Sequence, residues 1–299
     1  MYPTVTVPND ASELPEQLGT KFKFWYRDHN RRMLFKQGRP GTGENWAEKV
    51  CAEIAALLGL PHAPYDLAVW QGLHGVITPT FVPEDARLVL GNEIMARIVK
   101  GYEQTTTYNA REHTLSTVLT IMKLPRLGLP LGYSAPLPIS KAVDVFLGYL
   151  LLDALVANQD RHHENWAVIS WSGQGITLAP TYDHASSLGR NELDETRLRR
   201  LTTRDHGDSV DAYCARARSA FYSRTPGPKP LSTFDAFAEA ASSHPGAAGY
   251  WLQRLASTTL VQCEEILANV PESEMSQTAG QFALKMIEIN RGRLLDLVM

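Results

Sequence analysis

The sequence predicts an α+β fold with two lobes, a small β-rich N-lobe followed by a larger helical C-lobe. Short apolar stretches bounded by turn residues concentrate in the first part of the chain. Stretches with apolar residues at helical spacing dominate the remainder. The length of 299 residues suffices for two modest domains with cores of their own. We therefore expect an N-lobe over residues 1–92 and a helical C-lobe over residues 93–299.

The N-lobe is expected to start with a β-hairpin. Residues before about Leu18 are rich in Pro and polar side chains, which predicts an ill-ordered lead-in. The following sequence, KFKFWYRDHNRRMLFK, alternates around the turn-forming DHN. This pattern predicts two strands, of which the second ends at Lys36.

A helix and more strands follow the hairpin. The sequence WAEKVCAEIAALLG has apolar residues on one helical face, and Gly59 and Pro61 are expected to end the helix. Apolar stretches then predict strands over residues 65–72, 75–82 and 87–91.

The C-lobe is expected to be mainly helical. Helices are predicted over residues 115–123, 141–158, 209–222, 233–241, 249–269 and 278–298. Two short strands, WAVISW and GITLAP, flank the turn SGQG. The longest apolar stretch contains Asp144 and Asp153 and is shorter than the ~20 residues that a bilayer requires. It therefore predicts a buried helix, and we expect no membrane contact.

The bulk composition narrows the class of protein. Lys and Arg number 29 and Asp and Glu number 32, so the net charge of −3 offers no broad surface for direct nucleic-acid binding. The three cysteines have no metal-binding spacing, and the N-terminus lacks the pattern of a signal peptide. These features predict a reduced, cytoplasmic protein.

The most informative polar residues lie in the segment NQDRHHENWAVISWSGQGITLAPTYDH, which starts at Asn158. Asp160 and Asn165 are five residues apart, and Asp183 follows a short apolar stretch. Protein kinases use this arrangement, with an Asp that receives the proton of the acceptor hydroxyl and an Asn and a second Asp that hold magnesium on ATP. The spacing therefore indicates a phosphate-transfer site.

The sequence DRHHEN followed by LAPTYDH resembles HipA-type serine/threonine kinases, whose patterns are DRHxxN and LAPxYD. The resemblance implies a two-lobed protein-kinase-like fold that uses ATP and Mg²⁺. It implies that Asp160 is the catalytic base and that Asn165 and Asp183 are magnesium ligands. It also implies that His162 lies near the phosphates.

Other interpretations of these residues stay open. A single Asp or Asn in a loop is often a turn or cap residue. Arg161 is expected to pair with a buried acid or carbonyl, and His163 and Glu164 to be solvated. The Asp, His and Glu residues of the segment also suit a metal-dependent phosphohydrolase, although such ligands usually come from dispersed elements and no HExxH motif is present. A small-molecule kinase is a further alternative.

A kinase N-lobe needs a strand Lys that holds the ATP phosphates and a helix Glu that orients it. Lys36 ends the strand MLFK and Glu48 lies one turn into the following helix, so the family pattern falls on these two residues. Alternatively, Asn45 and Glu48 have the spacing of a capping box. Glu44 and Glu53 are weaker candidates for the helix Glu.

Nucleotide contacts are also expected elsewhere in the N-lobe. The loop GRPGTGEN resembles a Walker A motif, but Glu and Asn stand in place of Lys and Ser/Thr, so we predict a flexible turn. No GxGxxG is present, and LGTKFKF, with Lys21 and Lys23, is the alternative phosphate-binding segment. Thr80 and Phe81 are candidates for the adenine pocket, with plain core residues as the alternative.

The residues after Asp183 include a basic stretch with Arg190, Arg197, Arg199 and Arg200. Such a stretch is usually a solvated helix face, and in a kinase it is an alternative contact for an acidic substrate segment.

The predicted function is thus that of a HipA-like Ser/Thr protein kinase acting on a protein hydroxyl. The family implies a toxin–antitoxin role. Full-length members carry an extra small domain ahead of the N-lobe, whereas fewer than about 20 residues precede the first predicted strand here, too few for a core. This predicts a short form that works with a separate antitoxin or small companion protein, with a stand-alone kinase as the alternative.

Overall fold

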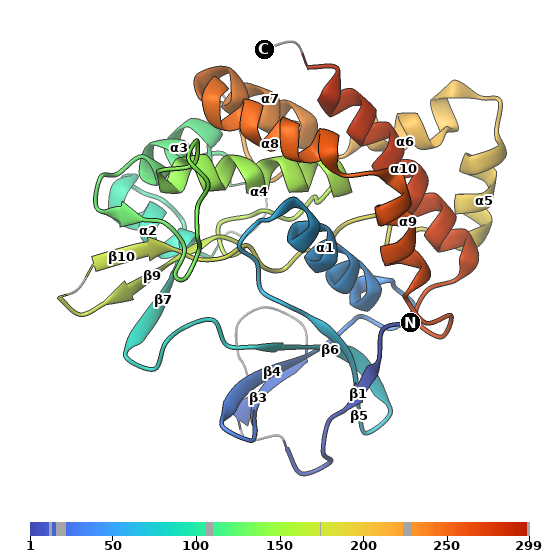
Figure 1. Cartoon of the computed structure of the whole chain (residues 1–299), viewed down its shortest axis with the longest axis horizontal. Helices are drawn as coiled ribbons and strands as arrows, with labels where there is room; N and C mark the ends of the chain where they lie inside the picture. The colour runs from blue at the N-terminus through green and yellow to red at the C-terminus, as the bar shows by residue number, and fades with distance from the viewer. Residues whose placement is uncertain (12–13, 16–21, 106–109, 174, 224–228, 298–299) are drawn as a thin grey trace.

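The computed structural model describes residues 1–11, 14–15, 22–105, 110–173, 175–223 and 229–297 (Figure 1). It has the expected two lobes, with a twisted sheet at one end of the molecule and a group of helices at the other. Helix α1, Glu44–Leu58, lies between them.

The N-lobe sheet has the strand order β1-β5-β6-β4-β3-β2. Its strands are β1 (Thr4–Thr6), β2 (Leu14–Pro15), β3 (Lys23–Asp28), β4 (Arg31–Gln37), β5 (Asp66–Trp70) and β6 (Leu73–Pro79). The predicted hairpin is confirmed by β3 and β4, which pair in antiparallel fashion. Phe24 and Phe35 are buried on one face of the sheet and pack against Trp70.

The prediction of an ill-ordered lead-in is wrong for the first residues of the chain. β1 pairs in parallel with β5, and Val7, which follows it, is 1% exposed. The alternation Thr-Val-Thr-Val suits a strand, and the edge of β5 supplies the partner that sequence alone does not reveal.

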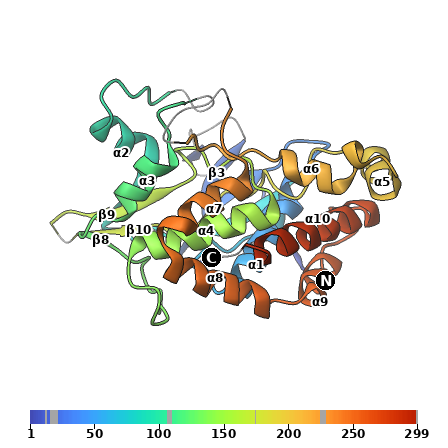
Figure 2. The ribbon, with the colours of Figure 1, turned by 90° about the horizontal axis from the view of Figure 1, so that it is seen from above.

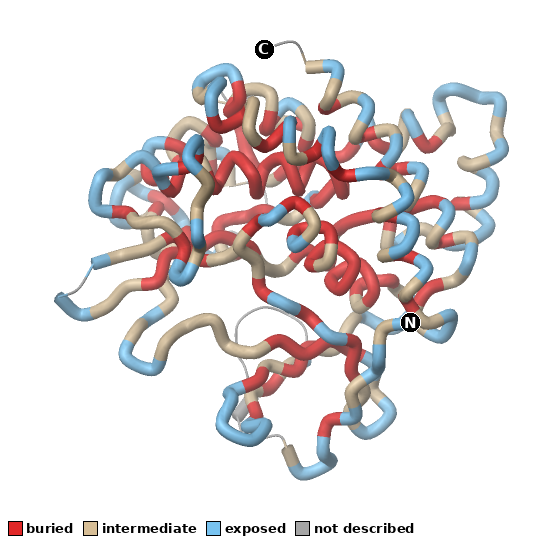
Figure 3. Tube along the Cα trace, viewed as in Figure 1, coloured by how far each residue is buried: buried red, intermediate tan, exposed pale blue. Residues whose placement is uncertain are grey.

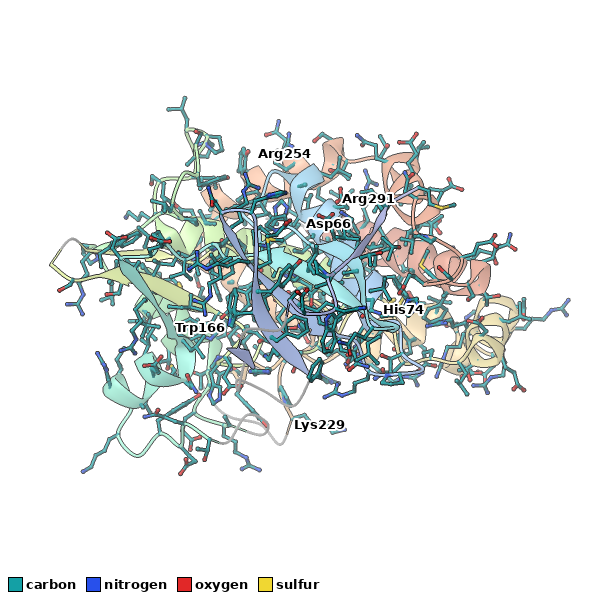
Figure 4. All side chains as sticks on the ribbon, turned by 90° about the horizontal axis from the view of Figure 1, so that it is seen from below. Asp66, His74, Trp166, Lys229, Arg254 and Arg291 are labelled. Atoms are coloured by element: carbon teal, nitrogen blue, oxygen red, sulfur yellow. The ribbon has the colours of Figure 1, made fainter. Side chains whose placement is uncertain are left out.

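Helix α1 connects the two lobes, and most of its residues are buried (Figure 3). It packs against β5 and β6 of the N-lobe and against helices of the C-lobe. It ends as predicted at Gly59, whose φ of 76° requires the left-handed conformation that glycine adopts easily. The carbonyls of Leu57 and Leu58 accept hydrogen bonds of 3.1 and 3.3 Å from Arg254 of the C-lobe (Figure 4). The helix is thereby fastened to the large lobe.

The C-lobe is built around helix α4, Ala142–Val156. All of its residues except Asp144 are buried, which is typical of a core helix with apolar residues all round. Figure 2 shows α7, α8 and α10 around it. The other helices are α2 (Gly91–Ile98), α3 (Leu115–Met122), α5 (Asp194–Thr202), the short 3₁₀ helix η1 (His206–Asp208), α6 (Val210–Arg216), α7 (Thr233–Ser243), α8 (Pro245–Ser257), α9 (Leu260–Ala268) and α10 (Gln277–Leu295).

Two predicted helices differ in the structure: one is divided in two and the other is shorter. The helix expected over 249–269 is divided into α8 and α9, because Thr259 forms a capping box with Gln262 and starts a new helix. The helix expected over 209–222 ends at Arg216, and the backbone beyond it pairs instead with residues 231–233.

A second sheet, with the order β7-β9-β10-β8, belongs to the C-lobe side of the molecule. It consists of β7 (Ala86–Leu90), β8 (Leu127–Gly128), β9 (Ala167–Trp171) and β10 (Gly175–Leu178). We expected β7 within the N-lobe, residues 1–92, but β7 pairs with β9. Strand pairing is a tertiary contact, which the local pattern does not specify. We propose that the lobes divide at residues 80–85, between β6 and β7.

Within the part of the chain that the structure describes, no helix has the length and apolar character needed to cross a bilayer. Cys51, Cys214 and Cys263 are buried and not paired with one another.

Candidate active site

Three charged side chains from three separate elements meet between the lobes. The Nζ atom of Lys36, near the end of β4, lies 3.1 Å from Oε2 of Glu48 on α1 and 2.5 Å from Oδ1 of Asp183, which follows β10. Lys36 pairs with Val76 of the neighbouring strand β6. A Cβ atom at Gly75 would lie 2.4 Å from the carbonyl oxygen of Lys36, so a glycine there allows the two strands to approach closely.

Lys36 is held in the charged form. Burial alone would lower the pKa of its ammonium group, but the carboxylates of Asp183 and Glu48 outweigh this effect and raise the pKa well above the usual value. The site therefore presents a fixed positive charge from a side chain that is 8% exposed.

Glu48 contacts both Lys36 and the segment that carries Asp183. Its Oε1 atom accepts a 2.6 Å hydrogen bond from the backbone N–H of His184. The alternative interpretation of Asn45 and Glu48 as a capping box is wrong, because the N-cap residue is Gly43 and no side chain caps this helix. Of the weaker candidates for the helix Glu, Glu53 pairs with Lys49, and Glu44 forms ion pairs away from Lys36.

The loop after α4 is fastened by a buried ion pair. Arg161 donates to both carboxylate oxygens of Asp153 at 2.7 Å and to the carbonyl oxygen of Asn165 at 2.9 Å. The predicted pairing of Arg161 with a buried acid and a carbonyl is thus confirmed. Because the guanidinium is rigid and planar, this arrangement fixes the loop between residues 158 and 165.

Asp160 and Asn165 lie within this loop and contact each other. The side-chain N–H of Asn165 donates a 2.6 Å hydrogen bond to the carbonyl oxygen of Asp160, so the amide oxygen of Asn165 is directed away from that carbonyl. The Oδ2 atom of Asp160 accepts a 3.3 Å hydrogen bond from the hydroxyl of Ser186. Ser186 lies three residues after Asp183, so the two motifs of the sequence are brought side by side.

The neighbouring histidines differ in their surroundings. The Nδ1 atom of His162 accepts a hydrogen bond from the backbone N–H of Glu164, so the neutral ring carries its proton on Nε2, which lies 3.6 Å from Oδ1 of Asp160. His163 was expected to be solvated, but it is 1% exposed and contacts the hydroxyl of Tyr102 at 2.5 Å. The proximity of His162 to phosphates stays a prediction.

The donor atoms at the site suit magnesium. The carboxylate of Asp183, whose side chain is 31% exposed, and the amide oxygen of Asn165 are hard oxygen donors. Magnesium usually takes one or two such protein ligands together with phosphate oxygens and water. No group of three His, Cys, Asp or Glu side chains is arranged for a metal ion among the described residues.

The other predicted nucleotide contacts have different outcomes. Lys21 lies outside the described residues, and Lys23 lies on β3 opposite Lys36. Thr80 follows β6, and its backbone N–H donates to the carbonyl of Arg32. Phe81 packs against Tyr182 with ring centroids 5.6 Å apart, which puts it next to the residue before Asp183. Both Thr80 and Phe81 thus lie on the connection between the lobes, and their contact with adenine stays a prediction.

The loop GRPGTGEN, predicted as a flexible turn, is tied to the site. Glu44 is 2% exposed and accepts hydrogen bonds from the backbone and the side chain of Arg39. Arg190 lies 3.2 Å from Glu44, and its carbonyl accepts a hydrogen bond from Gly43.

The basic stretch that contains Arg197 was predicted to be a solvated helix face. Arg197 is instead buried and forms an ion pair with Asp194. Sequence reasoning missed Glu44, Ser186 and Arg190 as a connected group. Only the nearness of Ser186 and Arg190 to Asp183 along the chain was a usable signal.

The two-lobed fold, with a strand Lys, a helix Glu and two loop Asp residues between the lobes, is kinase-like. The chain matches the HipA-like C-terminal domain over residues 17–257 and therefore belongs to that family. Family membership and fold together support a kinase of the HipA type.

Several solved structures share the fold. The chain is similar to the proinflammatory kinase CtkA of Helicobacter pylori, with 17% identity, a TM-score of 0.75, and coverage of 99% of this chain and 100% of that one. It is also similar to HipA of Shewanella oneidensis, with 12% identity, a TM-score of 0.59, and coverage of 96% of this chain and 68% of that one. That HipA was solved with HipB and operator DNA. No curated protein sequence matches this chain.

Proposed function

We propose that this protein is a HipA-type Ser/Thr protein kinase that transfers the γ-phosphate of ATP to a protein hydroxyl. The meeting of Lys36, Glu48 and Asp183 carries the proposal, because the three side chains come from a strand, a helix and a loop far apart in the sequence. A kinase needs this combination to hold ATP and its magnesium ions.

Each residue then has a specific role. Lys36 holds the ATP phosphates and Glu48 orients Lys36. Asn165 and Asp183 hold Mg²⁺, which when bound neutralises charge on the phosphates. Asp160 accepts the proton of the acceptor hydroxyl, and its position in the loop anchored by Arg161 suits this task.

The nucleotide has further candidate contacts. The backbone at Thr80 and Phe81 contacts adenine, and Lys21 and His162 contact the phosphates. The interlobe position of Phe81 beside Tyr182 supports the first part of this proposal.

Incubation with radiolabelled ATP, magnesium and a lysate of the native cell tests the activity. We expect label on Ser or Thr residues of one or a few proteins, and none with the Asp160→Asn variant. Label on a small molecule instead of protein would indicate a small-molecule kinase. Release of inorganic phosphate alone would indicate a phosphohydrolase.

We further propose that the protein is cytoplasmic and acts as the toxin of a toxin–antitoxin pair, with a DNA-binding antitoxin or small companion protein as its partner. The complex of the Shewanella HipA with HipB and DNA supports this by analogy of fold. The net charge of −3 suits a division in which the partner contacts nucleic acid. Affinity purification at native expression tests the proposal, and recovery of the chain alone would contradict it.

A further inference from the structure

A continuous series of polar contacts runs from the start of helix α1 to Asp160. Oε1 of Glu44 lies 3.2 Å from Nη1 of Arg190, and Nη2 of Arg190 donates a 2.8 Å hydrogen bond to the hydroxyl of Ser186. Ser186 in turn donates to Oδ2 of Asp160 at 3.3 Å. The side chain of Glu44 is 1% exposed and that of Arg190 is 13% exposed, so the ion pair that begins the series is shielded from solvent.

On the basis of the proposed kinase function, we propose that Arg190 and Ser186 are positioning residues that couple the placement of helix α1 to the orientation of the Asp160 carboxylate. Neither residue needs to contact ATP for this role.

The direction of the hydrogen bonds supports the coupling. A guanidinium only donates hydrogen bonds, so Ser186 must accept from Arg190. The single hydroxyl proton of Ser186 then points to Asp160, whose ionised carboxylate is the better acceptor. Arg190 thereby selects the hydroxyl rotamer that holds the Asp160 carboxylate in one orientation.

The placement of Glu44 supplies the link to the N-lobe. Glu44 and Glu48 are four residues apart on α1, so they lie one helical turn apart on the same side. The backbone of Arg190 adds a second link, because its carbonyl accepts a 2.9 Å hydrogen bond from Gly43, the N-cap residue of the helix. A shift of α1 that breaks the pair between Lys36 and Glu48 therefore also moves Arg190 and releases Ser186.

The first test measures the rate of protein labelling with radiolabelled ATP in the native lysate at several ATP concentrations. The variants are Ser186→Ala, Ser186→Thr and Arg190→Gln, with Arg204→Gln, the same change at an exposed arginine, as the matched control. We expect Ser186→Ala and Arg190→Gln to lower the maximal rate about tenfold to a hundredfold, as expected for loss of a charge-assisted hydrogen bond. The KM for ATP and the binding of Mg-ATP by calorimetry should be nearly unchanged, so that only the maximal rate falls. Ser186→Thr should restore activity, because threonine keeps the hydroxyl.

A second measurement is independent of activity. Carbon-13 labelling of aspartate and NMR at one neutral pH follow the carboxyl resonance of Asp160, assigned with Asp160→Asn. The chemical shift of this carboxyl carbon should change in Ser186→Ala and Arg190→Gln and stay unchanged in Arg204→Gln, because it responds to loss of the hydrogen bond from Ser186. An unchanged chemical shift in Ser186→Ala would overturn the coupling. Absence of any labelling by the wild-type protein would instead overturn the kinase function, while the chemical shift still decides the coupling.

Discussion

The Oε1 atom of Glu48 accepts a 2.6 Å hydrogen bond from the backbone N–H of His184, 136 residues away in the sequence. The other carboxylate oxygen of Glu48 pairs with Lys36. One side chain of helix α1 thus holds both the strand Lys of the N-lobe and the segment that carries Asp183. Replacement of Glu48 can therefore have two separate effects. One is loss of the charge that pairs with Lys36, and the other is loss of the hydrogen bond to the backbone of His184.

Replacement of Glu48 by Gln should lower phosphate transfer at least about tenfold, because Lys36 loses one of its two carboxylate partners. The amide oxygen of Gln still accepts from His184, so the melting temperature should change little. Steady-state kinetics and calorimetric melting measure the two effects. Glu53→Gln on the same helix is the control, and equal effects of both variants on activity would argue against the orienting role.

The two loop aspartates should respond differently to neutral substitution. Asp160→Asn should slow phosphate transfer about 10²- to 10⁴-fold and leave Mg-ATP binding intact, as expected for loss of a general base. Asp183→Asn should weaken magnesium-dependent ATP binding instead. Asn is preferred to Ala at residue 183 because it tolerates the left-handed backbone there, with a φ of 57°. Titration calorimetry with and without magnesium distinguishes the two roles, and wild-type transfer by Asp160→Asn would contradict them.

The buried pair of Arg161 and Asp153 should matter for folding. Arg161→Met leaves the Asp153 carboxylate, 5% exposed, without its cationic partner, which should lower the free energy of unfolding by about 3–5 kcal/mol. Adding Asp153→Asn removes the uncompensated charge and should recover part of the loss. Urea denaturation of the single and double variants measures this. A double variant no more stable than Arg161→Met would show that lost charge pairing is not the cause.

Acidification should destabilise the fold through His113. Its Nδ1 bonds to the carbonyl of Ala220, and its Nε2 accepts from the indole N–H of Trp166. Burial lowers the pKa of His113 to about 3 from the ordinary 6.5. Between these two pH values the unfolded chain binds more protons than the native protein. The contribution of neutral His113 to the free energy of unfolding is therefore fully present above about pH 6.5 and is lost as the pH falls towards 3.

The His113→Gln variant keeps a donor and an acceptor without a titrating ring, so its melting temperature should fall less steeply with acidification. Melting curves at several pH values check this. His163 contributes in the same direction, since burial lowers its pKa to about 4, and it remains in the variant. Parallel curves for wild type and variant would contradict the role of His113.

Much of the N-lobe was predictable from local pattern. The hairpin of β3 and β4 and the helix that ends at Gly59 follow from alternation, helical periodicity and a C-terminal glycine. The placement of β7 was not predictable, because its alternation says that it is a strand but not which sheet it joins. The division between α8 and α9 was missed because the helical spacing of apolar residues continues across Thr259. The capping box of Thr259 with Gln262 starts a new helix there.

For the site, the sequence by itself determined the pairing of Asp160 with Asn165 in one tight loop, because five residues of chain keep the two side chains near each other. It also determined the family resemblance, through two motifs and their order. Only the tertiary structure decided that Lys36 meets Asp183, 147 residues away, and that Glu44 meets Arg190 rather than Lys36. Such contacts depend on how helix α1 packs between the lobes, and packing is set by burial of apolar surface from the whole chain, which no local pattern encodes.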